Sequence, residues 1–117
     1  LKNHNLNEIA ESILSLGSDS LIIKQGEEGA TFFDKDTSFS VKAYPVRRVM
    51  DTTGAGDAFA GGILSSKMAG KNMEDSMIAG ATMASFCIEN IAHEGIVKVS
   101  DSEYKLRKEW IQSSLTY

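Results

Sequence analysis

The segment Asp51 to Gly62 constrains the fold of this 117-residue chain more than any other. It reads Asp-Thr-Thr-Gly-Ala-Gly-Asp-Ala-Phe-Ala-Gly-Gly and follows residues 46–50, which lead into it. Glycine permits backbone angles that other residues avoid, so Gly54 and Gly56 predict a turn whose amides point to one place. A helix that begins near Ala55 adds its positive end there. The segment therefore predicts an anion-binding turn between an extended stretch and a helix.

Asp57 stands one turn inside that predicted helix. A carboxylate there could accept the proton of a hydroxyl group that attacks a phosphoryl group. The alternative is an acidic residue that only stabilises the positive end of a helix, which is common. The complete motif around Asp57 favours the first interpretation. Asp57 is thus the candidate catalytic base, and Gly54, Ala55 and Gly56 form the candidate anion hole.

The same segment resembles the second signature of the ribokinase-like (PfkB) family, D-T-x-G-A-G-D followed by an aromatic and small residues, and the match is unbroken from Asp51 to Gly62. The stretch Ile22 to Ala30 is similar to the strand-and-glycine segment that lies beside the nucleotide in that family. The resemblance implies an α/β fold, a ribokinase-like sheet covered by helices, with this chain as its C-terminal nucleotide-binding portion.

The chain is short for a kinase of that family and opens at Leu1 rather than Met. We therefore expect residues 1–117 to be the C-terminal part of a PfkB-type kinase domain, without the N-terminal half that carries the lid and most acceptor contacts. Such a piece would expose sheet edges and apolar faces. A homodimer of the complete protein is compatible with the resemblance.

The resemblance implies an ATP-dependent phosphotransferase that acts on a hydroxyl group of a sugar, sugar phosphate or nucleoside. Mg2+ would bridge the ATP phosphates and be held mostly by phosphate oxygens and water. Lys24 and Gln25 either contact the phosphate or ribose or are exposed residues at a strand end. The candidate nucleotide-binding residues are Gly26, Gly29, Gly80, Ala81 and Ala84.

Two sets of candidates have a structural alternative. The small residues at positions 80, 81 and 84 also suit close helix packing. Asp51 and Thr53 would organise a site for a monovalent cation such as K+, the latter through its carbonyl group, but an aspartate after a strand is often only a turn former.

Composition limits the other function classes. The chain is 42% hydrophobic and 24% charged, without an apolar run of membrane-spanning length, so no membrane role is indicated. A single cysteine suits a reducing compartment, so a cytoplasmic location is expected. The net charge of −4 and the lack of a Lys/Arg cluster argue against nucleic acid. The single cysteine, Cys87, excludes an internal disulfide. His4 and His93 lack partners at zinc-ligand spacing.

Other phosphate- and cofactor-binding motifs are missing from the sequence. There is no G-x-x-x-x-G-K-[ST], and the glycines after Asp51 lack the third glycine of a dinucleotide fingerprint. Two rival interpretations remain open. One is a nucleotide-binding module without turnover, in which Asp57 would be vestigial; the other is an inactive structural fragment. The retained Asp57 disfavours the module.

Hydrophobic periodicity and turn residues predict the order of the elements. Helices are expected at residues 6–16, 55–68 and 74–91, with a last helix capped by Ser100 or Asp101. A buried strand is expected at 21–23, a loop at 26–29, and a hairpin of strands 30–33 and 39–44 that Pro45 ends. Tyr104, Leu106, Trp110 and Ile111 should form the apolar face of the last helix.

Overall fold

The computed structural model describes residues 6–46, 54–90 and 100–117, and for 88–90 it describes the backbone alone. The first half contains the helix α1 (Leu6–Leu14), the strand β1 (Ser20–Lys24), a short 3-10 helix η1 (Gly26–Glu28) and the strands β2 (Ala30–Asp34) and β3 (Ser38–Val41). The helices α2 (Ala55–Met68), α3 (Met73–Asn90) and α4 (Asp101–Ser113) follow. The α/β class is confirmed, and every expected helix is present.

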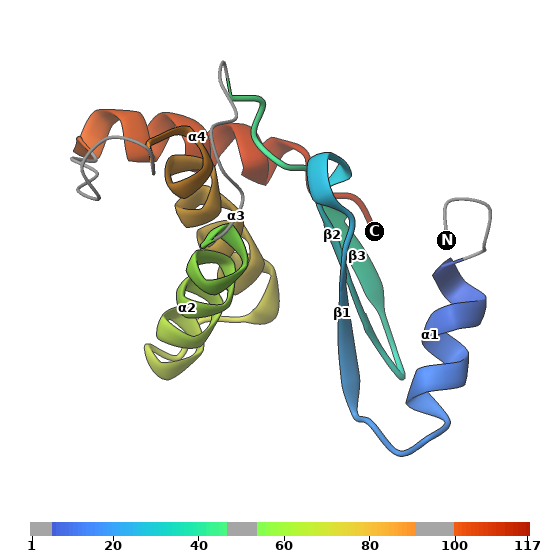
Figure 1. The fold of residues 1–117 in the computed structure, drawn as a ribbon. Helices are drawn as coiled ribbons and strands as arrows, with labels where there is room; N and C mark the ends of the chain where they lie inside the picture. The colour runs from blue at the N-terminus through green and yellow to red at the C-terminus, as the bar shows by residue number, and fades with distance from the viewer. Residues whose placement is uncertain (1–5, 47–53, 91–99) are drawn as a thin grey trace.

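The three strands form one antiparallel sheet in the order β1-β2-β3. Ala30 pairs with Val41 and Phe32 with Phe39, so these four apolar side chains share one face of the sheet. Helices α2, α3 and α4 lie on one side of the sheet and α1 on the other (Figure 1). The core between the sheet and the three helices also contains Phe59, Met77, Ile78 and Ile111.

The second strand of the expected hairpin is shorter than predicted, and the last residues of the chain pair with its outer edge. The second strand ends at Val41 rather than at residue 44. Ser40 exchanges two backbone hydrogen bonds with Thr116, of 2.8 and 3.0 Å, and the amide of Lys42 donates to the Ser114 hydroxyl group at 2.9 Å. The C-terminal segment thereby covers the free edge of β3, and the ladder to β2 ends at Val41 because Val41 pairs with Ala30, the first residue of β2.

Two smaller predictions near the N-terminus also need correction. Helix α1 ends at Leu14, earlier than expected, because Gly17 adopts a φ of 111° and its amide donates to the Leu14 carbonyl group. The expected loop at 26–29 contains the 3-10 turn η1 instead. In both places a glycine amide donates the hydrogen bond that ends the turn. The strands that follow are present where they were expected.

Helix α4 begins as expected, because the Ser100 hydroxyl group accepts a hydrogen bond from the Glu103 amide at 3.1 Å. Its apolar face was predicted correctly at Ile111, which is fully buried, and wrongly at Leu106 and Trp110. Leu106 is 56% exposed, whereas Arg107 is only 5% exposed and lies next to the core with Ile111. The guanidinium group of Arg107 stacks on Phe86 of α3, with 4.1 Å to the ring centroid.

Arg107 connects three segments of the chain. Its Nε donates to Glu103 at 3.0 Å and its Nη1 to the hydroxyl group of buried Ser85 at 3.2 Å. The guanidinium group also lies 4.9 Å from the ring centroid of Tyr44, which precedes the signature segment. A planar cation that satisfies these groups can be buried, whereas an aliphatic residue would leave Ser85 without this bond.

Helices α2 and α3 cross at two glycines. A Cβ atom on Gly62 would lie 2.7 Å from the Cα atom of Gly80, and one on Gly80 would lie 2.6 Å from the carbonyl oxygen of Phe59. Backbone, which cannot move aside, occupies both positions. The crossing therefore depends on the absence of side chains at Gly62 and Gly80, and it holds α2 against α3.

None of the helices in the described residues is long and apolar enough to cross a bilayer. The stretch 47–50, expected to lead into the signature as an extended segment, lies outside the described residues.

Candidate functional site

The predicted anion-binding turn lies at the beginning of α2. Gly54 is the N-cap residue, and the first intrahelical bond runs from the Ala58 amide to the Gly54 carbonyl group at 2.9 Å. The amides of Ala55, Gly56 and Asp57 precede that bond and therefore have no partner within the helix. Gly54 has no side chain that could cap them. The beginning of α2 thus presents amide donors together with the positive end of the helix dipole.

The prediction that Gly54 and Gly56 adopt backbone angles that other residues avoid was wrong. Neither Gly54, with φ of 176°, nor the helical Gly56 has the left-handed backbone that favours glycine. What distinguishes Gly56 is space: a Cβ atom there would lie 2.9 Å from the Nζ atom of Lys24. The missing side chain leaves room for a lysine ammonium group beside the turn.

Asp57 lies in the first turn of α2 and is exposed. Within the part of the chain that the structure describes, its carboxylate has no hydrogen bond or ion pair. A carboxylate without a protein partner can reach a ligand without first breaking a contact. This geometry is compatible both with a base and with a residue that only stabilises the helix end.

The Lys24 side chain extends from the end of β1 to the beginning of α2. It is the last residue of β1 and pairs with Ala30 of β2, which holds its backbone in the sheet. Its ammonium group reaches the space beside Gly56, so the end of β1 and the beginning of α2 are neighbours although they lie far apart in sequence. No pattern in the sequence alone could have indicated this contact.

The loop after β1 is closed by its own backbone. The Gln25 amide donates to the Gly29 carbonyl group at 2.8 Å, and the Gly29 amide donates to the Gly26 carbonyl group at 3.1 Å. Gly26 has a φ of 60° and open space where a Cβ atom would be. Gly29 has a φ of 102°, and a Cβ atom there would meet the Val41 carbonyl oxygen. Both glycines are thus required by backbone angle, and Gly29 also by its contact with β3.

Gln25 has a structural contact. Its side-chain oxygen accepts a hydrogen bond from the Thr31 hydroxyl group at 2.9 Å, and the same hydroxyl group lies 2.8 Å from that of Ser40. These bonds tie the loop to β2 and β3. Of the two residues considered for nucleotide contact, Lys24 therefore has its side chain at the turn and Gln25 has its side chain on the sheet.

The small residues of α3 contact protein. Gly80 faces Phe59 and Ile63 of α2, and Ala81 and Ala84 pack against the hydrophobic core. These contacts support the packing alternative for the three residues.

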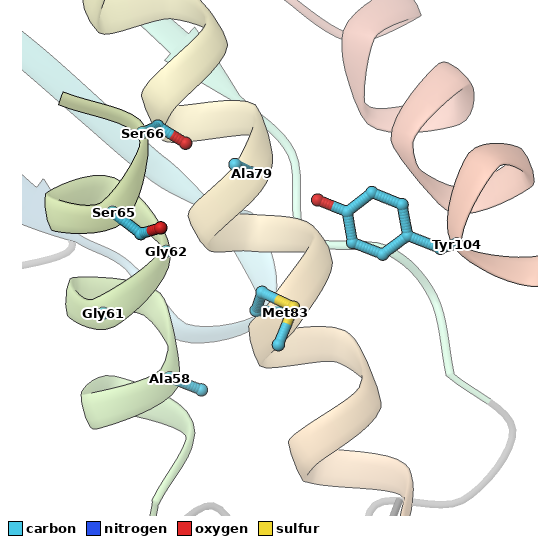
Figure 2. Close-up of a pocket in the computed structure, with 8 residues that line it drawn as sticks. All are labelled: Ala58, Gly61, Gly62, Ser65, Ser66, Ala79, Met83 and Tyr104. Atoms are coloured by element: carbon cyan, nitrogen blue, oxygen red, sulfur yellow. The ribbon is translucent and has the colours of Figure 1, made fainter. Parts of the chain in front are cut away.

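A groove of about 350 Å³ lies between α2, α3 and α4. Figure 2 shows its wall of small α2 side chains opposite Met83 of α3 and Tyr104 of α4, with Tyr104 directed toward α3. The sequence interpretation missed this groove because its lining combines residues from three helices. The lining residues are Ala58, Gly61, Gly62, Ser65, Ser66, Ala79, Met83 and Tyr104.

Several candidates lie outside the described residues: Asp51 and Thr53 of the predicted cation site, and both histidines. Cys87 is a free, partly buried residue of α3. Within the described ranges, no three His, Cys, Asp or Glu side chains lie close enough together to hold a metal ion.

Comparison with known proteins assigns the family. Residues 2–94 match the model of the pfkB family carbohydrate kinases, and the chain belongs to this family. The matched range includes both β1 with its glycine loop and the beginning of α2.

Two relatives agree with that assignment. The chain is 32% identical over 89 residues to a nucleoside kinase of Methanocaldococcus jannaschii, covering 76% of this chain and 28% of the relative. It is 32% identical over 103 residues to a ribokinase of Lactococcus lactis, covering 87% of this chain and 34% of the relative. The chain thus spans about a third or less of these two relatives.

Solved structures show the same fold. The ribokinase of Thermotoga maritima superimposes with a TM-score of 0.76 at 25% identity, over 91% of this chain and 35% of the ribokinase chain. The ribokinase fold expected from the signature is confirmed.

Proposed function

We propose that the complete protein containing this chain is an ATP-dependent kinase that phosphorylates a hydroxyl group of a sugar, sugar phosphate or nucleoside. Family membership supports the reaction class. The observation that carries the proposal is the beginning of α2, where the exposed Asp57 and three amides without helix partners lie in the same turn. The part of the kinase beyond residues 1–117 would supply most contacts to the acceptor.

In the proposed reaction, the Ala55, Gly56 and Asp57 amides stabilise the negative charge of the transferring phosphoryl group, and Gly54 leaves them uncovered. Asp57 accepts the proton of the acceptor hydroxyl group. The acceptor oxygen forms a bond to phosphorus as the bond to the leaving phosphate breaks, which yields a phosphorylated acceptor and ADP. Holding the reactants in line supplies much of the rate enhancement in such a transfer.

For the nucleotide, we propose that the loop carrying Gly26 and Gly29 lies along ATP. The open space beside Gly26 supports this, because it lets a ligand approach the backbone. Gly80, Ala81 and Ala84 remain candidates for the base pocket, although their described contacts are with protein.

Mg2+ would be bound through phosphate oxygens and water and would neutralise phosphate charge. We assign no step to it and no ligand from the described residues. Asp51 and Thr53 remain the candidates for a monovalent-cation site.

The test is consumption of ATP by the complete gene product with a panel of pentoses, hexoses, sugar phosphates and nucleosides. We expect ADP formation that depends on one class of acceptor and that falls by orders of magnitude in Asp57→Asn. ATP binding without turnover on any acceptor would favour the nucleotide-binding module instead. Activity of Asp57→Asn equal to the parent would remove Asp57 as the base.

A further inference from the structure

Arg107 is a buried cation that takes no direct part in the reaction proposed above. It is only 5% exposed. Its Nε and Nη1 atoms donate to Glu103 and Ser85, and its guanidinium group lies 4.1 Å from the ring centroid of Phe86. Glu103 belongs to the same helix, α4, whereas Ser85 and Phe86 belong to α3. Groups on two helices therefore fix the orientation of the guanidinium group.

The guanidinium group also contacts Tyr44, which lies beyond the end of the sheet. The strand β3 ends at Val41, and among the residues that the structure describes, the segment 43–46 takes part in no hydrogen bond. The Tyr44 ring instead packs against the core and lies 4.9 Å from the guanidinium carbon of Arg107. It also meets the Trp110 ring edge-on, with 5.3 Å between the centroids. The ring of Tyr44 thus anchors this segment to α4.

The anchored segment leads toward the turn with the candidate base. Figure 1 shows the chain after β3 leaving the sheet toward α4. Residues 45–53 then connect Tyr44 to Gly54, the N-cap residue of α2. On the other side of the turn, α2 is held against α3 where Gly62 meets Gly80. The turn therefore lies between two anchored parts of the chain, and the Arg107 contact belongs to the first of them.

We propose that Arg107 is a positioning residue for the phosphoryl transfer, because it holds Tyr44 against α4 and thereby fixes the approach of the chain to the turn that carries Asp57. This inference rests on the proposed kinase function. Arg107 touches neither the substrate nor the reacting atoms in this arrangement, and it neither gains nor loses a proton. Arginine suits the role because its planar group stacks on aromatic rings while its N–H groups donate hydrogen bonds, which the ammonium group of lysine does not combine.

The test uses the complete gene product with Arg107→Met, Arg107→Lys, Tyr44→Leu and the double variant of Arg107→Met with Tyr44→Leu. Phe33→Leu is the control for a loss of stability alone. Phe33 is 6% exposed and follows Phe32 in β2, so its side chain lies on the opposite face of the sheet from the core with Phe32. All proteins are compared at a temperature at which their unfolding curves show them to be folded. The readouts are kcat, the KM for ATP, and amide hydrogen exchange in the first turn of α2.

We expect Arg107→Met and Tyr44→Leu each to lower kcat by about twofold to thirtyfold, the factor that corresponds to the loss of one cation–π contact. The double variant should be no slower than the slower single variant, because both changes remove the same contact. Arg107→Lys, which keeps the charge without the planar group, should recover only part of the rate. Phe33→Leu should have the kcat of the parent.

Two further readouts separate positioning from a merely structural role. The KM for ATP should stay close to that of the parent, because the loop at residues 26–29 belongs to neither contact. Amide exchange in the first turn of α2 should become faster in Arg107→Met and Tyr44→Leu and stay unchanged in Phe33→Leu. A general loss of stability would accelerate exchange in all three.

Equal kcat values for Arg107→Met and Phe33→Leu would overturn the inference while leaving the kinase function intact. Additive losses in the double variant would also overturn it, because Arg107 would then not act through Tyr44. Should Arg107→Met fail to fold, a parental kcat for Tyr44→Leu would overturn it in the same way. If the parent has no turnover, the kinase function fails, and hydrogen exchange alone decides whether Arg107 fixes the turn: equal exchange in Arg107→Met and the parent would show that it does not.

Discussion

Gly56 and Gly62 lie on the same helix, yet their surroundings differ. A Cβ atom on Gly56 would meet only the flexible end of Lys24, whereas one on Gly62 would meet the backbone of Gly80. At the beginning of α2, Asp57 is exposed and the first amides have no partner within the helix, whereas the middle of α2 is packed against α3. The comparison teaches that a glycine-rich motif can contain both glycines that leave room for a flexible side chain and glycines that let two helices touch.

The largest effect is expected at the exposed beginning of the helix. Asp57→Asn in the complete protein should lower kcat by about a hundredfold to ten-thousandfold, the usual contribution of general base catalysis. Its free energy of unfolding should stay close to that of the parent, since the side chain is exposed. Kinetics and chemical unfolding of the same preparation check this. A large loss of stability would show that Asp57 belongs to the packed region instead.

Substitution of the glycines themselves tests the comparison directly. Gly62→Ala should lower the free energy of unfolding by about 1–3 kcal/mol, because the new methyl group meets Gly80 backbone. Gly61→Ala is the matched control, since nothing lies within 4 Å of its Cβ position. The control should be neutral or gain up to about 1 kcal/mol from helix propensity. Chemical unfolding measures all variants, and equal values for Gly61→Ala and Gly62→Ala would contradict the packed crossing.

Arg107 offers a third test, because it is a charged residue in the packed part. Arg107→Met should cost about 1–3 kcal/mol of unfolding free energy, since the buried bond to Ser85 and the stacking on Phe86 are lost. The partly exposed pair with Glu103 should add little. Glu103→Gln is the control, with an expected loss well below that of Arg107→Met. The reverse order would mean that the surface ion pair, rather than the buried contacts, holds α4.

The smallest effect is expected at Tyr117. Its hydroxyl group donates a hydrogen bond to Glu74 at 2.6 Å, and this bond, followed by desolvation and the charge of Glu74, raises the pKa of Tyr117 above the usual 10.0. Because the folded state binds the proton more tightly, the stabilising contribution is complete below pH 10 and disappears as the pH rises through the folded-state pKa. The stability difference between the parent and Tyr117→Phe, measured by unfolding at pH 7 and above pH 10, should shrink with rising pH. A difference that grows would contradict the hydrogen bond.

Local patterns in the sequence predicted the elements well where they contain their own start and stop signals. Helix α2 has the bounds expected from Gly54 and Gly70, and Ser100 caps α4. The same patterns failed where a distant segment decides the outcome. Thr116 pairs with the outer edge of β3. The partners of Arg107 include Ser85 of α3 and Tyr44, which lie far from it in sequence.

For the candidate site, too, local patterns predicted some features and missed those that depend on distant segments. The position of the turn before α2 could be predicted because its motif is contiguous. The reason for its glycines could not, because the space beside Gly56 is defined by Lys24 from another strand. The packing contacts of Gly80 likewise depend on how α2 and α3 cross, which no spacing in either helix specifies.

The most direct test of the proposed kinase function follows the phosphoryl group itself. The complete gene product would be incubated with ATP labelled in its terminal phosphate and with the acceptor panel. Label recovered on a hydroxyl group of one sugar or nucleoside, in amounts proportional to the protein, is the predicted result. Label found as inorganic phosphate alone, or left on ATP with every acceptor, would contradict it.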